Sequence, residues 1–280
     1  MRYIETELIK EKVQETLVKI NFEFDEGYIK VLENAFMREE AALGKEVLKD
    51  LLENAKIALN EKIPICQDTG MVNVYIELGQ DVTLKGRPLH EAVNEAVKGA
   101  YKENYLRPSI VEDPISRKNT GDNTPAIIHF ELVSGEKVTI FILAKGGGSE
   151  QICHVGMLSP HQGIEGVKEF VLSVVKEAGP NPCPPVILGV GIGGNFDYVA
   201  YLAKKALLRS WGERHPDPFY ADIELELISR INELGLGPGG LGGKFYVLDV
   251  RVATYPTHIA QLPVAVAFNC NAFRIGKIEI

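Results

Sequence analysis

A thiol, an amide and a carboxylate stand side by side in the stretch Ile65-Cys66-Gln67-Asp68-Thr69-Gly70. Pro64 precedes it and the strand-like residues 72–76 follow it, so we expect a tight connection at the entrance to a strand. Connections held by a rigid scaffold often carry chemistry. A thiolate can bind a soft metal, and the neighbouring amide and carboxylate can bind a polar ligand or move a proton.

Composition restricts the classes of protein that this chain can represent. Its 280 residues suffice for one large domain or two modest ones, and 45% of them are apolar, enough for a buried core. The net charge of -8 argues against nucleic acid as a partner, because a phosphate-binding surface needs excess cations. No apolar run approaches the roughly 20 residues that span a bilayer, and the charged N-terminus does not resemble a signal peptide. We therefore expect a cytoplasmic protein that binds neither membrane nor nucleic acid.

The four cysteines are Cys66, Cys153, Cys183 and Cys270, and none falls in a Cys-x-x-Cys pair. Their wide spacing in a chain of this length is not a disulfide framework, and it excludes zinc ribbons and thioredoxin-type sites. Two interpretations remain: inert buried thiols, or a site assembled from distant loops. On cysteine count alone, the inert thiols are the commoner case.

Hydrophobic periodicity predicts helices in residues 1–60 and a mixture of strands and helices in residues 61–280. Helices are expected over 4–18, 25–38, 45–59, 88–105, 161–178, 196–208 and 218–234, and strands over 72–76, 126–133, 137–143, 186–188, 245–253 and 263–268. Ser134-Gly135-Glu136 should join two of these strands as a hairpin. We predict an α+β fold in a single domain, 1–280, with an N-terminal helical segment followed by a mixed sheet with packed helices.

Three glycine-rich segments invite a ligand-binding interpretation. Residues 145–150 read Lys-Gly-Gly-Gly-Ser-Glu, whose uncovered backbone can direct N–H groups at an anion. Residues 189–194 match G-x-G-x-x-G, but residues 209–216 stand where a dinucleotide site would have a second strand that ends in an acidic residue. A helix N-terminus that receives an anion or packs closely is therefore favoured. The cluster at 235–244 is not a P-loop, because Pro238 replaces a required glycine.

Two further cysteines share the setting of Cys66. Four prolines surround Cys183 and fix the direction of its thiol, and two asparagines flank Cys270 after a predicted strand. Cys153 follows the triple glycine without such framing. Three thiolates from distant loops can hold three irons of a cubane cluster and leave the fourth iron open. An open iron can act as a Lewis acid on a hydroxyl and a carboxylate, so that hydroxide can leave.

Together these motifs resemble the iron-sulfur, class I fumarate hydratases and the related L-tartrate dehydratases, in particular their alpha subunit or N-terminal region. The resemblance covers nearly the whole chain from Cys66 onward. It rests on Cys-Gln-Asp-Thr-Gly at 66–70, Asn-Tyr-Leu-Arg at 104–107, Asn-Thr-Gly-Asp-Asn-Thr-Pro at 119–125, residues 144–149, Cys-Pro-Pro at 183–185, residues 236–244, and His258 with residues 262–266 before Cys270. The combination is highly specific, although each motif alone is not.

The resemblance implies a role for each matching residue. Cys66, Cys183 and Cys270 match the ligands of a [4Fe-4S] cluster, and Cys153 matches none. Positions that contact a small dicarboxylate substrate are matched by Gln67, Asp68, Arg107, Gly148 and Gln151, where Gln151 replaces the Asn of the family. His258 matches a histidine near the substrate, and Asp68 and His258 are the expected catalytic residues that handle the proton of the departing water.

The chemistry of these residues agrees with the roles that the resemblance implies. Arg107 offers a planar fork for a carboxylate, and the Gly148 loop can present N–H donors to a second carboxylate or to developing enolate charge. Without the resemblance, the ordinary explanations would be a surface ion pair for Arg107, a turn for Asp68 and a core histidine for His258.

The resemblance also implies a partner. In the family a further region supplies the base that takes the carbon-bound proton, so we expect a beta-type subunit, two alpha and two beta chains, and no activity from this chain alone. The leading function is hydro-lyase activity, the reversible hydration of fumarate to (S)-malate. The alternatives are dehydration of L-tartrate to oxaloacetate with the same cluster, and a non-catalytic iron-sulfur or redox-sensing subunit.

Overall fold

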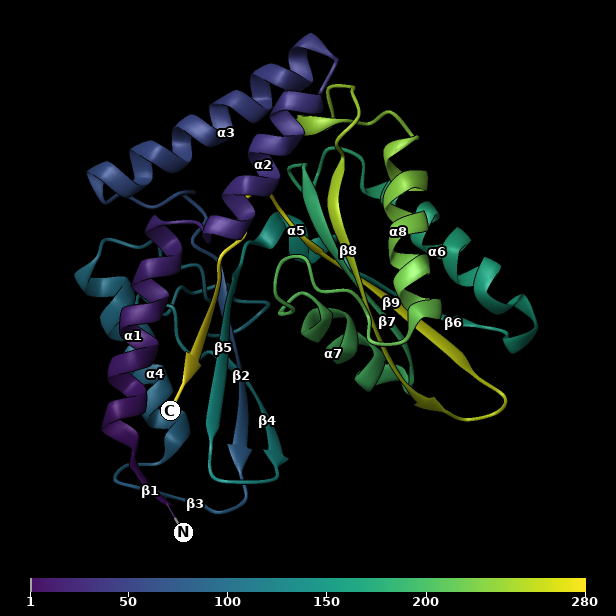
Figure 1. Ribbon diagram of the computed structural model, residues 1–280. Helices are drawn as coiled ribbons and strands as arrows, with labels where there is room; N and C mark the ends of the chain where they lie inside the picture. The colour runs from purple at the N-terminus through teal and green to yellow at the C-terminus, as the bar shows by residue number, and fades with distance from the viewer. Residues whose placement is uncertain (1) are drawn as a thin grey trace. The chain divides into compact units, whose positions relative to one another are not determined.

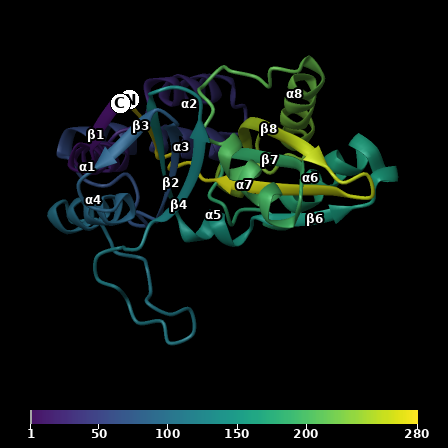
Figure 2. The same cartoon turned by 90° about the horizontal axis from the view of Figure 1, so that it is seen from below.

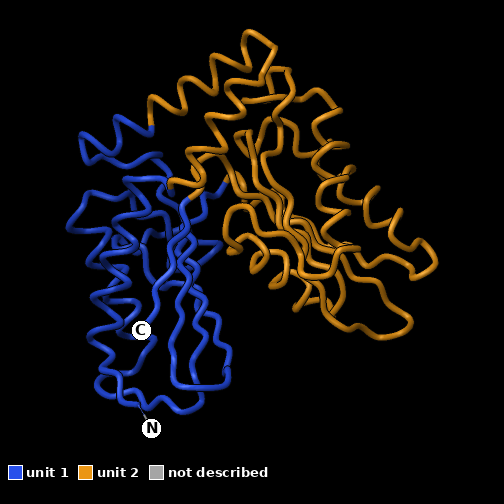
Figure 3. The backbone as a smooth tube through the Cα atoms, in the orientation of Figure 1, with its two compact units in different colours: residues 1–25, 55–147, 274–280 blue, residues 26–54, 148–273 orange. Residues whose placement is uncertain are grey.

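The computed structural model describes residues 2–280 and has the predicted α+β fold (Figure 1). The described chain forms two compact units (Figure 3). Unit 1 contains the described residues up to 25 together with 55–147 and 274–280, and unit 2 contains 26–54 and 148–273. Each unit is therefore assembled from stretches far apart in sequence, and the predicted N-terminal helical segment is divided between the two.

Unit 1 combines two helices with two small sheets. Its elements are β1 (Arg2–Glu5), α1 (Thr6–Phe22), β2 (Met71–Gly79), β3 (Val82–Lys85), α4 (Leu89–Glu103), β4 (Ile127–Val133), β5 (Val138–Lys145) and β10 (Ile275–Glu279). Four strands form a mixed sheet in the order β10-β5-β2-β4, and β1 pairs with β3 in parallel. Helices α1 and α4 pack together and share one apolar core with the larger sheet (Figure 1). Their apolar residues recur at helical spacing, as in Ile9, Val13 and Leu17, which explains why these segments are helices.

The predicted hairpin between β4 and β5 is wrong. Strand β2 lies between them, parallel to β4 and antiparallel to β5. The connection passes over the end of β2 at Gly79, where a side chain would place a Cβ only 2.4 Å from the carbonyl oxygen of Gly135. The turn between β4 and β5 is short, yet the two strands do not pair, because β2 fits between them and ends beneath the turn in Gly79.

Unit 2 is built on a second four-stranded sheet, in the order β6-β9-β7-β8. Its elements are α2 (Glu26–Arg38), β6 (His154–Leu158), α6 (Gly163–Ala178), β7 (Val186–Gly194), α7 (Phe196–Ala206), α8 (Pro218–Asn232), β8 (Val247–Thr257) and β9 (Leu262–Asn269). Helices α6 and α8 pack together over one face, and α7 covers the other (Figure 1). The side chains of Asn195 and Asp217 accept backbone hydrogen bonds at the starts of α7 and α8. Two further helices, α3 (Ala42–Glu61) and α5 (Gly147–Gln151), each include a boundary between the units.

The glycines at 189–194 continue strand β7 rather than forming a ligand loop. A Cβ on Gly189 would lie 1.9 Å from the carbonyl oxygen of Ala203, and one on Gly191 would lie 2.3 Å from that of Val199. Both oxygens belong to α7, so the glycines let this helix approach the strand closely. Of the two expectations for this motif, close packing is confirmed.

Four short strands were not predicted: β1, β3, β6 and β10. Each has only four or five residues, and all four lie at the edge of a sheet or in a two-stranded ribbon. Strands this short pair only because a neighbour presents its backbone, which local sequence does not record. Among the described residues, no helix combines the length and apolar character needed to cross a membrane.

A buried carboxylate, Glu39, connects the end of α2 to the segment that precedes β8. The side chain is 3% exposed and accepts hydrogen bonds from the backbone N–H groups of Glu40, Ala41, Lys244 and Phe245 at 2.9 to 3.1 Å. Burial by itself would raise the pKa of this carboxyl, but the four N–H groups lower the pKa below its ordinary value overall. The charged form of Glu39 therefore stabilises unit 2.

Replacing Glu39 by Gln should lower the free energy of unfolding by about 1–3 kcal/mol at neutral pH, because N–H groups would lose a charged acceptor. The lowered folded pKa places this stabilisation above the unfolded pKa of about 4.3, and it disappears as the pH falls through the folded pKa. Urea unfolding at several pH values should show the difference from wild type shrinking below about pH 4. Glu40→Gln, at the exposed neighbouring position, is the control and should show little difference; a constant Glu39→Gln difference at all pH values would contradict the assignment.

Candidate functional site

The carboxylate of Asp68 is the best-anchored polar group in the turn before β2. Its Oδ1 accepts hydrogen bonds from the N–H of Gly70 at 3.0 Å and the hydroxyl of Ser109 at 3.5 Å, and its Oδ2 accepts one from the N–H of Gly147 at 2.9 Å. The uncovered backbone of the 145–150 segment was expected to direct N–H groups at an anion. In unit 1 the anion at Gly147 is the Asp68 carboxylate itself.

Arg107 lies beside the same turn. The hydroxyl of Thr69 donates to the carbonyl oxygen of Arg107 at 2.8 Å, while the guanidinium side chain belongs to an exposed residue. Residues 104–126 form a long connection between α4 and β4 that projects from the sheet (Figure 2). The base of this connection thus holds the backbone of Arg107 against the turn that carries Asp68.

Asn123 ties this projecting connection to the Asp68 turn. It is fully buried, has a left-handed backbone with φ of 63°, accepts a hydrogen bond from the N–H of Ser109 at 2.7 Å and donates one to the carbonyl oxygen of Gly70 at 3.1 Å. Asparagine tolerates this conformation better than most residues. Its amide bridges the two segments that carry Arg107 and Asp68.

Two buried side chains donate hydrogen bonds to the backbone of the Asp68 turn. Nη1 of Arg274 donates to the carbonyl oxygen of Asp68 at 2.7 Å and to Oδ1 of Asn21 at 3.3 Å, and the residue is 1% exposed. The hydroxyl of Tyr101 donates to the carbonyl oxygens of Thr69 and Gly70. Burial raises the pKa of Tyr101 to about 12, although the charge of Arg274 opposes the rise, so the phenol stays a hydrogen-bond donor at physiological pH.

Unit 2 brings Cys183 and Cys270 to the same end of its sheet. The backbone N–H and the side-chain amide of Asn271 both donate to the carbonyl oxygen of Cys183, at 3.2 and 3.0 Å. Cys183 has a left-handed φ of 55° and is exposed, and Cys270 is half-buried. The proline-rich loop and the Asn-flanked loop are therefore joined by two hydrogen bonds.

Tyr28 supports the Cys270 loop from α2. Its hydroxyl donates to the carbonyl oxygen of Asn271 at 2.7 Å, and its ring packs on Trp211 and Phe273 at 5.3 and 5.5 Å between centroids. Burial, and secondly the nearby Cys270, raise the pKa of Tyr28 well above its ordinary value. The phenol therefore remains a neutral donor to this loop.

The remaining predicted residues of unit 2 lie at two places. Gly148 is exposed, and a Cβ there would lie 3.4 Å from the carbonyl oxygen of Asn181, two residues before Cys183; Gln151 ends the same short helix, α5. His258 lies at the other end of the sheet, because Thr257 pairs with Gly194 whereas Asn269 pairs with Ile187. At about 3.3 Å per residue, the length of β7 separates these ends by roughly 23 Å. Within unit 2, His258 is not beside the cysteines.

The three predicted cluster ligands have suitable chemistry. The thiol of Cys66 lies 3.3 Å from Oε1 of Gln67 at the surface of unit 1. The thiol of Cys153 instead lies 3.3 Å from the carbonyl oxygen of Ser149 in the short helix that precedes it, α5. Among residues 2–280, no three His, Cys, Asp or Glu side chains are close enough to bind one metal ion. Exposed or half-buried thiols on irregular backbone fit the donor set of an iron-sulfur cluster, whose ligands bind different irons.

Sequence reasoning assigned no role to Asn123, Arg274, Tyr101 or Tyr28. Asn123 lies inside the motif at 119–125, and Arg274 follows Cys270 by four residues. The structural role of a buried amide or guanidinium is recognised only when its hydrogen-bond partners are known. The two tyrosines gave no signal, since their helical spacing is that of ordinary core residues. These four residues shape the segments that carry the predicted site residues.

The chain belongs to the fumarate hydratase (Fumerase) family, whose sequence model matches residues 10–279. A protein of Methanocaldococcus jannaschii, provisionally named L(+)-tartrate dehydratase subunit alpha, is 42% identical over 89% of this chain and 90% of its own length. The L(+)-tartrate dehydratase subunit alpha of Escherichia coli strain K12 is 34% identical over 86% of this chain and 80% of its own length. The family that the sequence motifs indicated is thereby confirmed.

Replacing Asn123 by Ala should free the N–H of Ser109 and loosen the connection at Arg107. Loss of two buried hydrogen bonds should speed amide exchange at Ser109 by about tenfold or more. Hydrogen-exchange mass spectrometry of the peptide that contains Ser109 measures this. Asn123→Asp keeps the acceptor for Ser109 and should show the smaller increase; equal exchange in wild type and Asn123→Ala would contradict the bridging role.

Proposed function

We propose that this chain is the alpha-type subunit of a hydro-lyase that adds water to fumarate and removes it from (S)-malate. The observation that carries the proposal is the anchored Asp68 carboxylate with Arg107 held beside it, in a chain of the fumarate hydratase family. Dehydration of L-tartrate is the second candidate, favoured by the names of the two relatives. Both reactions act on small dicarboxylates and remove or add water next to a carboxylate.

Each residue of the chain has a proposed task in this reaction. Arg107 binds one substrate carboxylate through its guanidinium, and the N–H groups near Gly148 bind the other carboxylate or the charge that develops beside it. Gln67 and Gln151 supply amide contacts to the substrate. Asp68 is held by three donors, which fixes the direction in which its carboxylate can accept a proton from the water that adds, or return that proton to the hydroxyl group that leaves.

Cys66, Cys183 and Cys270 would hold a [4Fe-4S] cluster. When bound, the cluster supplies a Lewis-acidic iron that helps hydroxide to leave. The wide spacing of the four cysteines is not that of a disulfide framework and suits a reducing compartment, so we also propose a cytoplasmic location. A non-catalytic iron-sulfur or redox-sensing subunit would use the same thiols, but it would not need an anchored carboxylate and an arginine side by side.

The partner is proposed to be a beta-type subunit that contributes the base for the carbon-bound proton, in an assembly of two alpha and two beta chains. The names of the relatives, subunit alpha, support a partner. The position of His258 supports more than one alpha chain. Because His258 lies a strand length from Cys183 and Cys270 in its own unit, it would act in the site of a second copy.

Anaerobic assays of the purified complex with fumarate and L-tartrate in parallel test the substrate. We expect turnover of a dicarboxylate by the complex and none by this chain alone, with Asp68→Asn lowering kcat by about a hundredfold or more.

Cys183→Ser should lose bound iron and acid-labile sulfide, whereas Cys153→Ser should retain both. Full activity from the chain alone, or an unchanged iron content in Cys183→Ser, would refute the corresponding part of the proposal.

Complementation between two inactive variants tests the role of His258. His258→Asn and Arg107→Ala complexes should each be nearly inactive, and mixed complexes that carry one copy of each variant should regain one intact site. Statistical mixing in a two-fold assembly should restore about a quarter of wild-type activity. Activity no greater than the sum of the two variants would show that His258 does not act in the other copy's site.

A further inference from the structure

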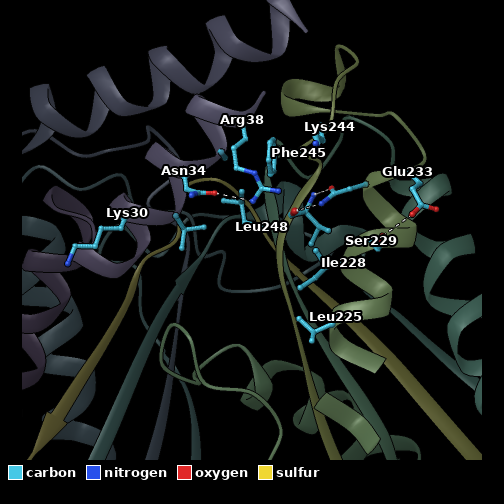
Figure 4. Close-up of a pocket in the computed structure, with 14 residues that line it drawn as sticks. Lys30, Asn34, Arg38, Leu225, Ile228, Ser229, Glu233, Lys244, Phe245 and Leu248 are labelled. Atoms are coloured by element: carbon cyan, nitrogen blue, oxygen red, sulfur yellow. Dashed lines mark hydrogen bonds between the residues drawn. The ribbon is translucent and has the colours of Figure 1, made fainter. Parts of the chain in front are cut away.

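A groove of about 790 Å³ in unit 2 contains none of the proposed site residues (Figure 4). One face of α2, from Lys30 to Arg38, forms one wall, and one face of α8, from Leu225 to Glu233, forms the other. The floor is the segment that leads into β8 together with the first residues of that strand, within 244–248. Eight residues of helix measure about 12 Å, so each wall is about two helical turns long.

The groove is held open by side chains from both walls. Glu39 fastens the end of α2 to the N–H groups of Lys244 and Phe245. The side-chain oxygen of Asn232 in α8 accepts hydrogen bonds from the N–H groups of Tyr246 and Val247 at 3.0 and 2.9 Å. The side-chain amide of Asn232 donates a hydrogen bond to the carbonyl oxygen of Val247. Walls and floor are therefore connected by hydrogen bonds, and a ligand would not have to order them on binding.

An added β-strand cannot occupy this side of the sheet. β8 is an edge strand, but its outer backbone groups are used by side chains of unit 2. The carbonyl oxygen of Val250 accepts from Arg214, the N–H of Val252 donates to Glu224, and the carbonyl oxygen of Val252 accepts from Arg209. Blocking an edge in this way prevents strand addition, so an occupant must bind through side-chain packing.

The lining combines apolar and cationic side chains. Leu225, Ile228 and Leu248 are the apolar surface, and Leu225 is 53% exposed. Arg38 reaches into the groove (Figure 4), where Asn34 accepts its hydrogen bond at 3.3 Å and the Phe245 ring lies 5.6 Å away. The lining contains three cations, Lys30, Arg38 and Lys244, and one carboxylate, Glu233, in a chain whose net charge is -8.

We propose that this groove is the docking site for an acidic amphipathic helix of the partner subunit. The inference rests on the proposed function, which supplies the partner. Apolar anchors of such a helix would pack on Leu225, Ile228 and Leu248 over two turns, and its carboxylates would face Arg38 and the two lysines. The cationic lining selects an acidic segment, which the mostly acidic surface of this chain would otherwise repel.

Titration of the purified second subunit into variants of this chain tests the proposal. Leu225→Asp places a carboxylate among the apolar anchors, and Arg38→Glu reverses the central charge. Each should weaken the complex by about tenfold or more. The wild-type complex should weaken with rising salt, and Arg38→Glu should reduce that dependence. Thermal unfolding of each variant alone establishes that it remains folded.

Two matched controls share the chemistry of these changes but lie outside the groove. Phe219→Asp alters a residue of the same helix with a similar exposed fraction, 55%, and Lys176→Glu reverses an exposed cation of α6. Both should change affinity by less than about threefold. Wild-type affinity in Leu225→Asp and Arg38→Glu, or no binding of the second subunit to the wild-type chain, would overturn the proposal.

The outcomes separate this inference from the proposed function. Weakened binding in the groove variants, with no turnover of fumarate or L-tartrate by the wild-type complex, would support the docking site and refute the function. Full turnover with unaltered binding in those variants would do the reverse. If the chain alone self-associates and Leu225→Asp abolishes that association, the occupant is a second copy, and the proposed partner helix is wrong.

Discussion

The anchoring of the Asp68 carboxylate is the constraint on which the candidate site depends. A carboxylate at the surface of a turn would normally rotate, but here backbone N–H groups from Gly70 and Gly147 hold both of its oxygens. The same turn receives Arg274 through its carbonyl oxygen and the Arg107 segment through Thr69. Charged acceptors make the stronger hydrogen bonds, so the Asp68 side chain firmly connects its own turn to the segments of Ser109 and Gly147.

The supports of this turn are buried while the groups proposed to meet substrate are exposed. Asn123, Arg274 and Tyr101 are at most 2% exposed, and each bonds to the backbone of the turn or its neighbour. Arg107 and Gln67 extend from that backbone into solvent. Such an arrangement fixes the positions of reactive groups without burying them, which is what preorganisation requires.

In unit 2, too, supporting side chains hold the segments that carry the proposed site residues. Asn271 connects the Cys183 and Cys270 loops, and Tyr28 holds Asn271 from α2. The neighbouring part of the unit, where Glu39 and Asn232 fasten two helices to the start of β8, is equally well bonded but carries none of the proposed chemistry. Its apolar and cationic lining is more easily understood as a surface for another chain than as part of the reaction site.

Local sequence determined the class of fold, most helices and the family, because helical periodicity and the Cys-Gln-Asp-Thr-Gly and Cys-Pro-Pro motifs are properties of neighbouring residues. It also indicated that the backbone near Gly147 would meet an anion. Only the tertiary structure decided that β2 lies between β4 and β5, that Gly189 and Gly191 admit α7, and that His258 stands a strand length from Cys183. Strand order and close approaches depend on contacts between segments far apart in the chain, and those contacts leave no pattern in any one segment.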